Sequence, residues 1–458
     1  MNIKKAIIFI LFILSIDKSP IVFCQSYQAD WQSPDQRPVP DWYPGAKFGI
    51  FIHWGIYSVP AWATDSYADG FGSNYAEWYW QRLIDTNLKI HKDFEAFHAR
   101  VYGPGFHYQD FAPQFKCELF KPNEWAQLFK DAGAQYVVLT SKHHDGFCLW
   151  PSAQSWNWNS MDIGPHRDLA GELSDAVKQA GLHMGFYYSL YEWYNPLYRK
   201  DVNAYVSQHM LPQLRDLVLR YKPDVLWADG DWEQSATTWQ SKTFLAWLYN
   251  ESPVRNTIVV NDRWGNDTKG KHGDFYTSEY GHGTTSMDKP WEETRGIGQS
   301  FGYNRNEDLK DYASSNELIH ELISRVARGG NFLLNIGPAA DGTIPVIMQQ
   351  RLLDIGKWLQ VNGEAIYGTI PWHEAPEINS NTDVFFTQKG NKVFSIITQW
   401  KNEITINNIS KPSKIELLGF DGTVQSKYKQ GKLIVTLPKL TPDIIPCESA
   451  WTLKILLK

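Results

Sequence analysis

Seven short apolar segments, each ending in polar or aromatic residues, are the feature of this sequence that most limits its fold. They span residues 48–52, 136–139, 184–188, 225–227, 257–260, 274–277 and 331–334. Amphipathic helical patterns lie between several of them; one runs from Pro122 and ends at Gly133. Strands that alternate with helices are typical of βα units around a parallel sheet, so we predict an α/β fold.

Two α/β architectures fit this alternation. In a TIM-like (β/α) barrel the carboxyl ends of the strands and the following loops form one functional face, which suits segments that all end in reactive side chains. An open doubly wound sheet is the alternative. No glycine-rich phosphate-binding motif follows any of the seven segments, and we therefore predict the barrel.

The pattern changes after Pro371. Short apolar segments such as 384–387, 393–397 and 432–437 are separated there by Gly, Asn and Lys turns. We predict that residues 25–370 form the barrel domain and that residues 371–458 form a C-terminal antiparallel β-sandwich. No row of aromatic residues marks a binding face on this second domain, so we expect it to buttress the barrel.

The N-terminus has the pattern of a secretory signal. Two lysines precede an apolar run from Ala6 to Ile16, which is too short to cross a bilayer comfortably. We predict a signal peptide at residues 1–24, with an uncleaved anchor as the alternative. The mature protein is then expected in the periplasm or outside a bacterial cell, or in the lysosome or outside a eukaryotic cell, with no membrane span.

Composition excludes some partners and favours another. The 44 Lys and Arg residues are outnumbered by 50 Asp and Glu residues, and no basic cluster offers a face to nucleic acid. Aromatic residues make up 15% of the chain and include 21 Trp. A Trp-rich core is one explanation, and stacking of sugar rings in a cleft is the other.

Two carboxylates lie at the ends of nearby predicted strands. Alternation along a strand directs Trp227 and Asp229 to one side, and it groups Thr277 with Glu279 in a later segment. Arg263 ends the segment between them, where a cation can hold a carboxylate or grip a hydroxyl. Paired carboxylates are what glycoside cleavage requires. Solvated loop carboxylates are the simpler explanation of either residue alone.

The sequence His143-His144-Asp145 follows the second apolar segment and could bind a metal, stabilise the structure or bind a substrate. Adjacent residues of an extended segment face opposite ways, so the two imidazoles converge only if the backbone bends. The spacing also differs from helical zinc motifs. We favour substrate binding, because a neutral imidazole donates one hydrogen bond and accepts another, as a sugar hydroxyl requires.

Nine blocks between Trp42 and Thr369 together resemble the α-L-fucosidases of glycoside hydrolase family 29. The blocks are WYPGAKFGIFIHWGIYSVPAW, NYAEWY, SKHHDGFCLW, GPHRDL, GFYYSLYEW, DVLWADGDWE, VNDRWG, DFYTSEY and NFLLNIGPAADGTI. The resemblance implies retaining hydrolysis of terminal α-L-fucosyl linkages through a covalent fucosyl-enzyme. It implies fucosylated oligosaccharides or glycoconjugates as substrates, no metal and no other cofactor, and it leaves the oligomeric state open.

The same resemblance assigns the catalytic roles. The block DVLWADGDWE matches the family's nucleophile block and places that role on Asp229. Bacterial members often read T-P-E-Y where this chain has Thr277-Ser278-Glu279-Tyr280, which makes Glu279 the predicted acid/base. Glu292 is the rival for this role.

The resemblance also predicts the residues that bind fucose. They are His53, Glu77, Trp78, His143, His144, Tyr188, Trp227 and Arg263, with Glu292 as a further candidate. Such a set suits the sugar, because three hydroxyls need donors and acceptors while the C6 methyl needs an apolar wall. Two other functions stay open: a lectin-like barrel that binds fucose without turnover, and a metal-dependent hydrolase built on His143-His144-Asp145.

Overall fold

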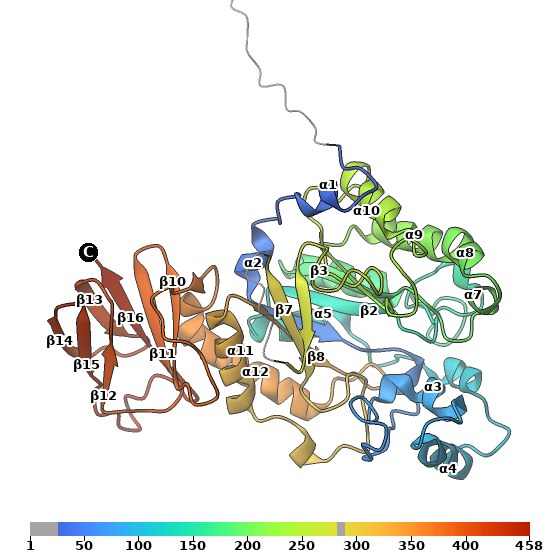
Figure 1. Ribbon diagram of the computed structural model, residues 1–458. Coiled ribbons are helices and arrows are strands. Elements are labelled where there is room, and N and C mark those ends of the chain that lie inside the picture. The colour runs from blue at the N-terminus through green and yellow to red at the C-terminus, as the bar shows by residue number, and fades with distance from the viewer. Residues whose placement is uncertain (1–25, 282–288) are drawn as a thin grey trace, which may run out of the picture.

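The structure is a computed structural model that describes residues 26–281 and 289–458 (Figure 1). The predicted signal peptide lies outside these ranges. A larger α/β unit, on the right of Figure 1, is followed by a smaller all-β unit on the left, and helices α11 and α12 lie between the two. No helix of the described ranges is long and apolar enough to cross a bilayer.

Eight parallel strands form the sheet of the larger unit. They are β1 (Phe48–Ile52), β2 (Tyr136–Lys142), β3 (His183–Ser189), β4 (Val225–Asp229), β5 (Val259–Val260), β6 (Tyr276–Glu279), β7 (Trp291–Gly296) and β8 (Asn331–Ile336). Their order is β5-β4-β3-β2-β1-β8-β7-β6, which is the cyclic order of a barrel. The predicted α/β barrel fold is confirmed, in the form of a curled sheet.

The sheet is curled rather than closed by a continuous ladder, because β5 and β6 share no ladder in the described residues. Their ends are joined by individual hydrogen bonds instead. The amide of Asp274 donates to the carbonyl of Val260 at 2.9 Å, and the Asp262 carboxylate accepts from the amide of Thr277 at 3.1 Å. These contacts hold the ends of β5 and β6 beside each other, where the residues after β5 and those of β6 enter the functional site.

Strand β7 is the strand that the sequence pattern missed. Its sequence, Trp-Glu-Glu-Thr-Arg-Gly, is polar, yet Glu292 and Glu293 are both completely buried. Burial raises the pKa of the Glu293 carboxyl, although Arg325 of helix α11 (Ser315–Ala327) lies 3.9 Å away and acts in the opposite direction. A hydrophobicity pattern cannot identify such a strand, because tertiary partners compensate its charges.

Helices surround the sheet where amphipathic segments predicted them. The predicted ones are α5 (Pro122–Asp131), α6 (Leu169–Gln179), α9 (Leu211–Tyr221) and α11. The others are α1 (Gln32–Asp35), α2 (Trp42–Ala46), α3 (Tyr79–Ile84), α4 (His91–Val101), α7 (Pro196–Lys200), α8 (Val202–Tyr205), α10 (Ser241–Asn250) and α12 (Val346–Asn362). Capping fixes their starts: Asp168 accepts from Gly171 at the start of α6, and Ser314 and Glu317 form a capping box at α11.

Strand alternation separates two apolar layers as predicted. Val225 and Trp227 belong to the cluster inside the barrel, whereas Leu226 and Ala228 pack in the layer under the helices. Tyr43 of α2 lies in the inner cluster and packs its ring 4.5 Å from that of Phe275. The inner cluster supports the functional residues above it.

The smaller unit contains two antiparallel sheets. The first has the order β13-β16-β11-β10-β9 and the second β12-β15-β14. The strands are β9 (Ile370–Pro371), β10 (Val384–Lys389), β11 (Lys392–Ile397), β12 (Glu403–Ile406), β13 (Pro412–Leu417), β14 (Gln425–Lys429), β15 (Lys432–Thr436) and β16 (Trp451–Leu457). Their shared core, which includes Val393, Leu433 and Ile455, confirms the predicted β-sandwich.

The sandwich is attached to the helices of the barrel by directed hydrogen bonds. The indole Nε1 of Trp358, on α12, donates to the carbonyl of Ala450 at 2.9 Å, and Nε2 of His320, on α11, lies 2.8 Å from the carbonyl oxygen of Ser449. Glu364 binds both Lys392 and Lys454 of the first sheet. These contacts agree with the buttressing role expected of this domain.

Candidate active site

A pocket of about 270 Å³ opens at the carboxyl ends of the barrel strands. It brings together nine of the residues predicted from the sequence: His53, Glu77, Trp78, His143, His144, Trp227, Asp229, Arg263 and Glu279. They come from loops and strand ends far apart in the chain. This is where the functional groups of a (β/α) barrel are expected.

Two carboxylates in the pocket share one guanidinium. Nη1 of Arg263 donates to Oδ1 of Asp229 at 3.1 Å, and its Nη2 forms an ion pair with Oε1 of Glu279 at 2.6 Å. Nε of the same side chain donates to Oγ1 of Thr277 at 2.9 Å, and the guanidinium lies 4.7 Å from the centroid of the Trp227 ring. Arg263 is therefore held on four sides, and it fixes both carboxylates at one end of the pocket.

The pKa of Arg263 reflects this pairing. Burial lowers it, but the charges of Glu279, Asp229, Asp231 and Asp262 together outweigh burial and raise the pKa above its ordinary value. The guanidinium therefore remains a permanent cation between the two acids.

The predicted Tyr188 is wrong, because the pocket contains its neighbour Tyr187. The hydroxyl of Tyr187 donates to Oδ2 of Asp229 at 2.8 Å, whereas that of Tyr188 donates to Gln213 at 2.7 Å in the layer under the helices. Successive residues of β3 face opposite sides, so a slip by one residue exchanges inside for outside.

Glu292 does not line the pocket and is fully buried beneath it, contrary to the prediction. Its Oε1 accepts from Nε1 of Trp227 at 2.9 Å, and its Oε2 accepts from the hydroxyls of Tyr43 and Tyr136. Burial raises the pKa of this carboxyl to about 7. Glu292 orients the Trp227 indole, which forms part of the pocket wall, and it has no access to a ligand.

Two of the pocket histidines have a defined tautomer. The Ser189 hydroxyl donates to the carbonyl of Tyr191 at 2.6 Å, so it can only accept from Nδ1 of His144, 2.7 Å away. The Asn335 amide nitrogen donates to the carbonyl of Phe301, which leaves its oxygen to accept from Nδ1 of His53 at 2.7 Å. Nε2 of each neutral imidazole is therefore a hydrogen-bond acceptor.

These histidines are kept neutral by burial. It lowers the pKa of His53 to about 4, and together with the neighbouring His144 and His53 it lowers the pKa of His143 well below its ordinary value. Burial also lowers the pKa of His144, and His53 and Lys142 act in the same direction. Buried Nδ1 of His143 has no hydrogen-bond partner within the described chain.

The backbone bends where the two histidines follow β2, as their convergence requires. The ladder between β2 and β3 shifts register after Thr140, and the amide of Gly146 donates to the carbonyl of His143 at 3.1 Å to close a turn. The imidazole centroids of His143 and His144 lie 4.1 Å apart in the same pocket. Within the described ranges no three His, Cys, Asp or Glu residues are arranged to hold a metal ion.

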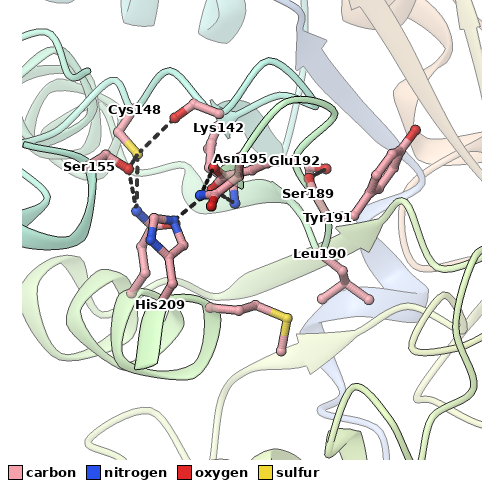
Figure 2. Close-up of polar contacts among 12 residues, drawn as sticks. Lys142, Cys148, Ser155, Ser189, Leu190, Tyr191, Glu192, Asn195 and His209 are labelled. Carbon is pink, nitrogen blue, oxygen red and sulfur yellow. Dashed lines mark hydrogen bonds and ion pairs between the residues drawn. The ribbon is translucent and has the colours of Figure 1, made fainter. Parts of the chain in front are cut away.

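Behind this turn lies a second group of charged and polar residues, which we call the support cluster: Lys142, Glu192, Asn195 and His209 (Figure 2). Nζ of Lys142 and Nε2 of His209 each lie 2.8 Å from Oε1 of Glu192, and Asn195 donates to Oε2 at 2.7 Å. Burial acts to raise the pKa of Glu192, but Lys142, His209 and Asn195 together outweigh it and hold the pKa well below its usual value. The carboxylate is therefore fully paired.

The support cluster fixes two walls of the pocket. Gly146 has φ +78°, and a Cβ at this position would lie 2.7 Å from Oε2 of Glu192, so the turn after His143 and His144 is pressed against the cluster. The residue after Glu192, Trp193, donates its amide to the carbonyl of His144 at 2.9 Å. Its ring packs 5.0 Å from that of Trp78.

Glu77 and Trp78 also line the pocket, and the Trp78 ring lies 5.2 Å from that of His144. Oε2 of Glu77 accepts from the amide of Gly302 at 2.8 Å and from the Ser300 hydroxyl at 3.2 Å. Burial raises the pKa of Glu77 to about 7, so near neutral pH it can serve either as a donor or as an acceptor. The guanidinium of Arg82 covers the Trp78 ring at 4.9 Å.

Several residues that line the pocket were not identified from the sequence. They are Phe51, Phe71, Gly72, Tyr75, Arg82, Tyr187, Trp232, Thr294 and Phe301. Strand alternation would have identified Phe51, two residues before His53, but the loop residues carry no such signal. The buried hydroxyls of Tyr75 and Thr294 have no hydrogen-bond partner among the described residues.

Comparison with known proteins identifies the family. The α-L-fucosidase family model matches residues 16–364, and the model of the α-L-fucosidase C-terminal domain matches residues 378–456. The chain belongs to the α-L-fucosidase family. It is a glycoside hydrolase, and the resemblance noted in the sequence is confirmed.

Relatives from distant organisms match this chain over most of their length. Rat tissue α-L-fucosidase is 46% identical over 444 residues, covering 94% of this chain and 92% of the relative. The α-L-fucosidase of Dictyostelium discoideum is 48% identical over 375 residues, covering 80% and 78%. A crystal structure of Thermotoga maritima α-fucosidase with fucose is 38% identical with a TM-score of 0.79, covering 94% and 100%.

Proposed function

We propose that this α-L-fucosidase hydrolyses terminal α-L-fucosyl linkages of glycans with retention of configuration, through a covalent fucosyl-enzyme. Asp229 is the nucleophile and Glu279 the acid/base. The observation that carries the proposal is the single Arg263 guanidinium that contacts both carboxylates in the pocket. A Thermotoga maritima α-fucosidase, 39% identical, has been crystallised with a mechanism-based inhibitor, which supports covalent chemistry in this family.

The first step forms the bond between an Asp229 carboxylate oxygen and the anomeric carbon. The bond from that carbon to the leaving oxygen breaks, and Glu279 gives its proton to this oxygen. Arg263 and the Tyr187 hydroxyl orient Asp229 for the attack. Retaining enzymes hold their carboxyl groups about 5–5.5 Å apart, and we expect this separation in the substrate complex.

The second step reverses the proton transfer. A water molecule attacks the anomeric carbon, Glu279 takes its proton, and the bond to Asp229 breaks. Two inversions at the same carbon retain the configuration. The neutral imidazoles of His53, His143 and His144 bind the fucose hydroxyls, and the rings of Phe51, Trp227 and Phe301 supply apolar surface for the C6 methyl.

The stereochemistry of the product tests this mechanism. Proton NMR during hydrolysis of an aryl α-L-fucoside should show α-L-fucose first, with the β anomer appearing only by mutarotation. Initial release of β-L-fucose would establish inversion and reject the covalent step. Fucose binding without any turnover would instead support a lectin-like protein, and loss of activity in excess EDTA would support a metal-dependent hydrolase.

Substitution of the acid/base separates its role from that of Asp229. Glu279→Gln should lower kcat for a fucosyl disaccharide by about 10²- to 10⁴-fold, which is the range of general acid catalysis. The loss should be much smaller for α-L-fucosyl fluoride, because fluoride leaves without a proton. Glu292→Gln, at the rival carboxyl, is the matched control. If Glu279→Gln lowered kcat equally for the disaccharide and the fluoride, the assignment of Glu279 would be contradicted.

We also propose that residues 1–24 direct the chain into the secretory pathway and that residue 371 begins the separate sandwich domain. The apolar run after Lys4 and Lys5 supports the first proposal. Relatives named tissue and plasma α-L-fucosidase agree with a lysosomal or extracellular enzyme in a eukaryote, or with its periplasmic or extracellular counterpart in a bacterium. Mass spectrometry of the mature N-terminus tests the cleavage.

A further inference from the structure

Two large aromatic side chains on the rim of the pocket are exposed to solvent. Phe71 has 67% of its surface exposed and Trp232 has 43%, and both line the pocket. Large aromatic side chains are usually buried, and at a sugar-binding pocket an exposed ring is free to stack on a pyranose. The two rings are therefore candidates for contact with the part of the substrate that lies beyond the fucose.

The two rings pack against different neighbours. Trp232 comes three residues after Asp229 and stacks on Trp78, with ring centroids 6.2 Å apart and planes at 20°. Phe71 instead packs against Tyr280, the residue after Glu279, with ring centroids 5.6 Å apart. Phe71 thus lies beside the residue that follows the acid/base, whereas Trp232 packs on the Trp78 ring.

The chemistry of the reaction distinguishes the two rings. The acid protonates the oxygen that joins fucose to the next sugar, so that oxygen must lie within hydrogen-bond distance of Glu279. The nucleophile attacks the opposite face of the anomeric carbon. The second sugar therefore leaves the pocket on the side of Glu279, where Phe71 is exposed.

We propose that Phe71 is the platform on which the pyranose next to fucose stacks, and that it favours oligosaccharide substrates over substrates without a second ring. This inference rests on the proposed role of Glu279 as the acid. The bound group is the apolar face of a hexopyranose such as galactose or N-acetylglucosamine. Trp232, which stacks on Trp78, then belongs to the wall around that ring.

The loop that presents Phe71 is held by hydrogen bonds within the chain. Gly70 and Gly72 flank the ring with φ of +85° and +79°, a conformation that glycine adopts without strain. The Ser73 hydroxyl donates to the carbonyl of Gly70 at 2.7 Å, and Nη2 of Arg82 donates to that of Gly72 at 3.3 Å. A ring held in this way loses little freedom when a sugar stacks on it.

The test compares substrates with and without a second ring. For each variant, kcat/KM is measured for α-L-fucosyl disaccharides of galactose and N-acetylglucosamine and for α-L-fucosyl fluoride. Phe71→Ala should lower the disaccharide-to-fluoride ratio about tenfold, the order expected for one lost stacking contact, and Phe71→Tyr should restore it. Trp156→Ala is the matched control, since this ring is 79% exposed and does not line the pocket.

Each outcome decides a different point. An unchanged ratio in Phe71→Ala would overturn the inference, as would a ratio that falls in Trp232→Ala but not in Phe71→Ala. A wild-type protein that hydrolyses no α-L-fucoside would instead reject the proposed function. Active wild type with a lowered ratio in Phe71→Ala and an unchanged ratio in Trp156→Ala would support both.

Discussion

The pocket and the support cluster both contain buried charged residues, yet their polar atoms are paired to different degrees. In the support cluster the buried Glu192 carboxylate is bound by three side chains, those of Lys142, His209 and Asn195. In the pocket, two acids share the single Arg263, and Nδ1 of His143 has no partner in the described structure. Complete pairing stabilises a structure, whereas incomplete pairing in a cavity leaves groups free for a substrate.

This comparison predicts that the two regions respond oppositely to substitution. Changes in the pocket should reduce activity while the free energy of unfolding stays nearly constant. Changes in the support cluster should first reduce the free energy of unfolding, and activity should fall only as the walls that it holds become disordered.

The largest effect is expected at the nucleophile. Asp229→Asn should lower kcat by at least about 10⁴-fold, because the amide cannot form the fucosyl-enzyme. The free energy of unfolding, from urea denaturation, should change by less than about 1 kcal/mol, as at sites where function rather than stability is the constraint. A variant that loses stability and activity together would remove the distinction between the two regions.

Lys142 should show the opposite behaviour. Lys142→Met leaves the Glu192 carboxylate buried with its main cation removed, which should lower the free energy of unfolding by about 3–5 kcal/mol. The double variant Lys142→Met/Glu192→Gln should recover most of this loss, because the buried charge is removed as well. Urea denaturation of wild type and both variants measures it. Equal stability of wild type and Lys142→Met would contradict the structural role of the cluster.

The neutral pocket histidines predict how stability depends on pH. The pKa of His53 is about 4 in the folded chain, against about 6.5 when unfolded, so the unfolded state binds more protons between these values. The free energy of unfolding should therefore fall as pH drops from about 6.5 to about 4. His53→Asn should reduce this slope by up to about 1.4 kcal/mol per pH unit.

Urea denaturation at several pH values checks this slope. His107→Asn is the matched control, because the side chain of His107 is 75% exposed. A slope in His53→Asn equal to that of the wild type would show that His53 is not held neutral by the fold.

The adjacent tyrosines provide the smallest and most local comparison. Tyr187→Phe removes a hydrogen bond to the Asp229 carboxylate and should lower kcat/KM on an aryl α-L-fucoside by about 10- to 100-fold, equivalent to about 1.5–3 kcal/mol. Tyr188→Phe removes the bond to Gln213 and should change stability by about 1 kcal/mol with little effect on kcat/KM. A larger loss of kcat/KM in Tyr188→Phe than in Tyr187→Phe would show that Tyr188, and not Tyr187, faces the pocket.

The sequence predicts the parts of this structure that follow from periodicity. Apolar segments locate seven strands, and alternation places Trp227 and Asp229 inside the barrel. The apolar pattern does not predict strand β7, because Glu292 and Glu293 carry charges that only the folded chain compensates. No local pattern shows that these carboxylates have Tyr43, Tyr136 and Arg325 as neighbours.

The positions of the loop residues of the pocket do not follow from periodicity. Phe71 and Trp232 reach the rim through turns whose direction depends on distant contacts, such as that of Arg82 with the carbonyl of Gly72. The turn at His143 and His144 likewise depends on Glu192, which lies 48 residues beyond His144 in the sequence. Family motifs identify several such residues, but the periodicity of a single sequence cannot predict where they lie in the fold.

Trapping of the covalent intermediate tests the central claim most directly. A 2-deoxy-2-fluoro-α-L-fucosyl fluoride, whose second fluorine destabilises charge at the anomeric carbon and slows turnover, should inactivate the enzyme and add one fluorofucosyl group per chain. Peptide mass spectrometry should locate this group on Asp229. Inactivation with the label on another residue, or turnover with no labelled enzyme at any time, would contradict the account.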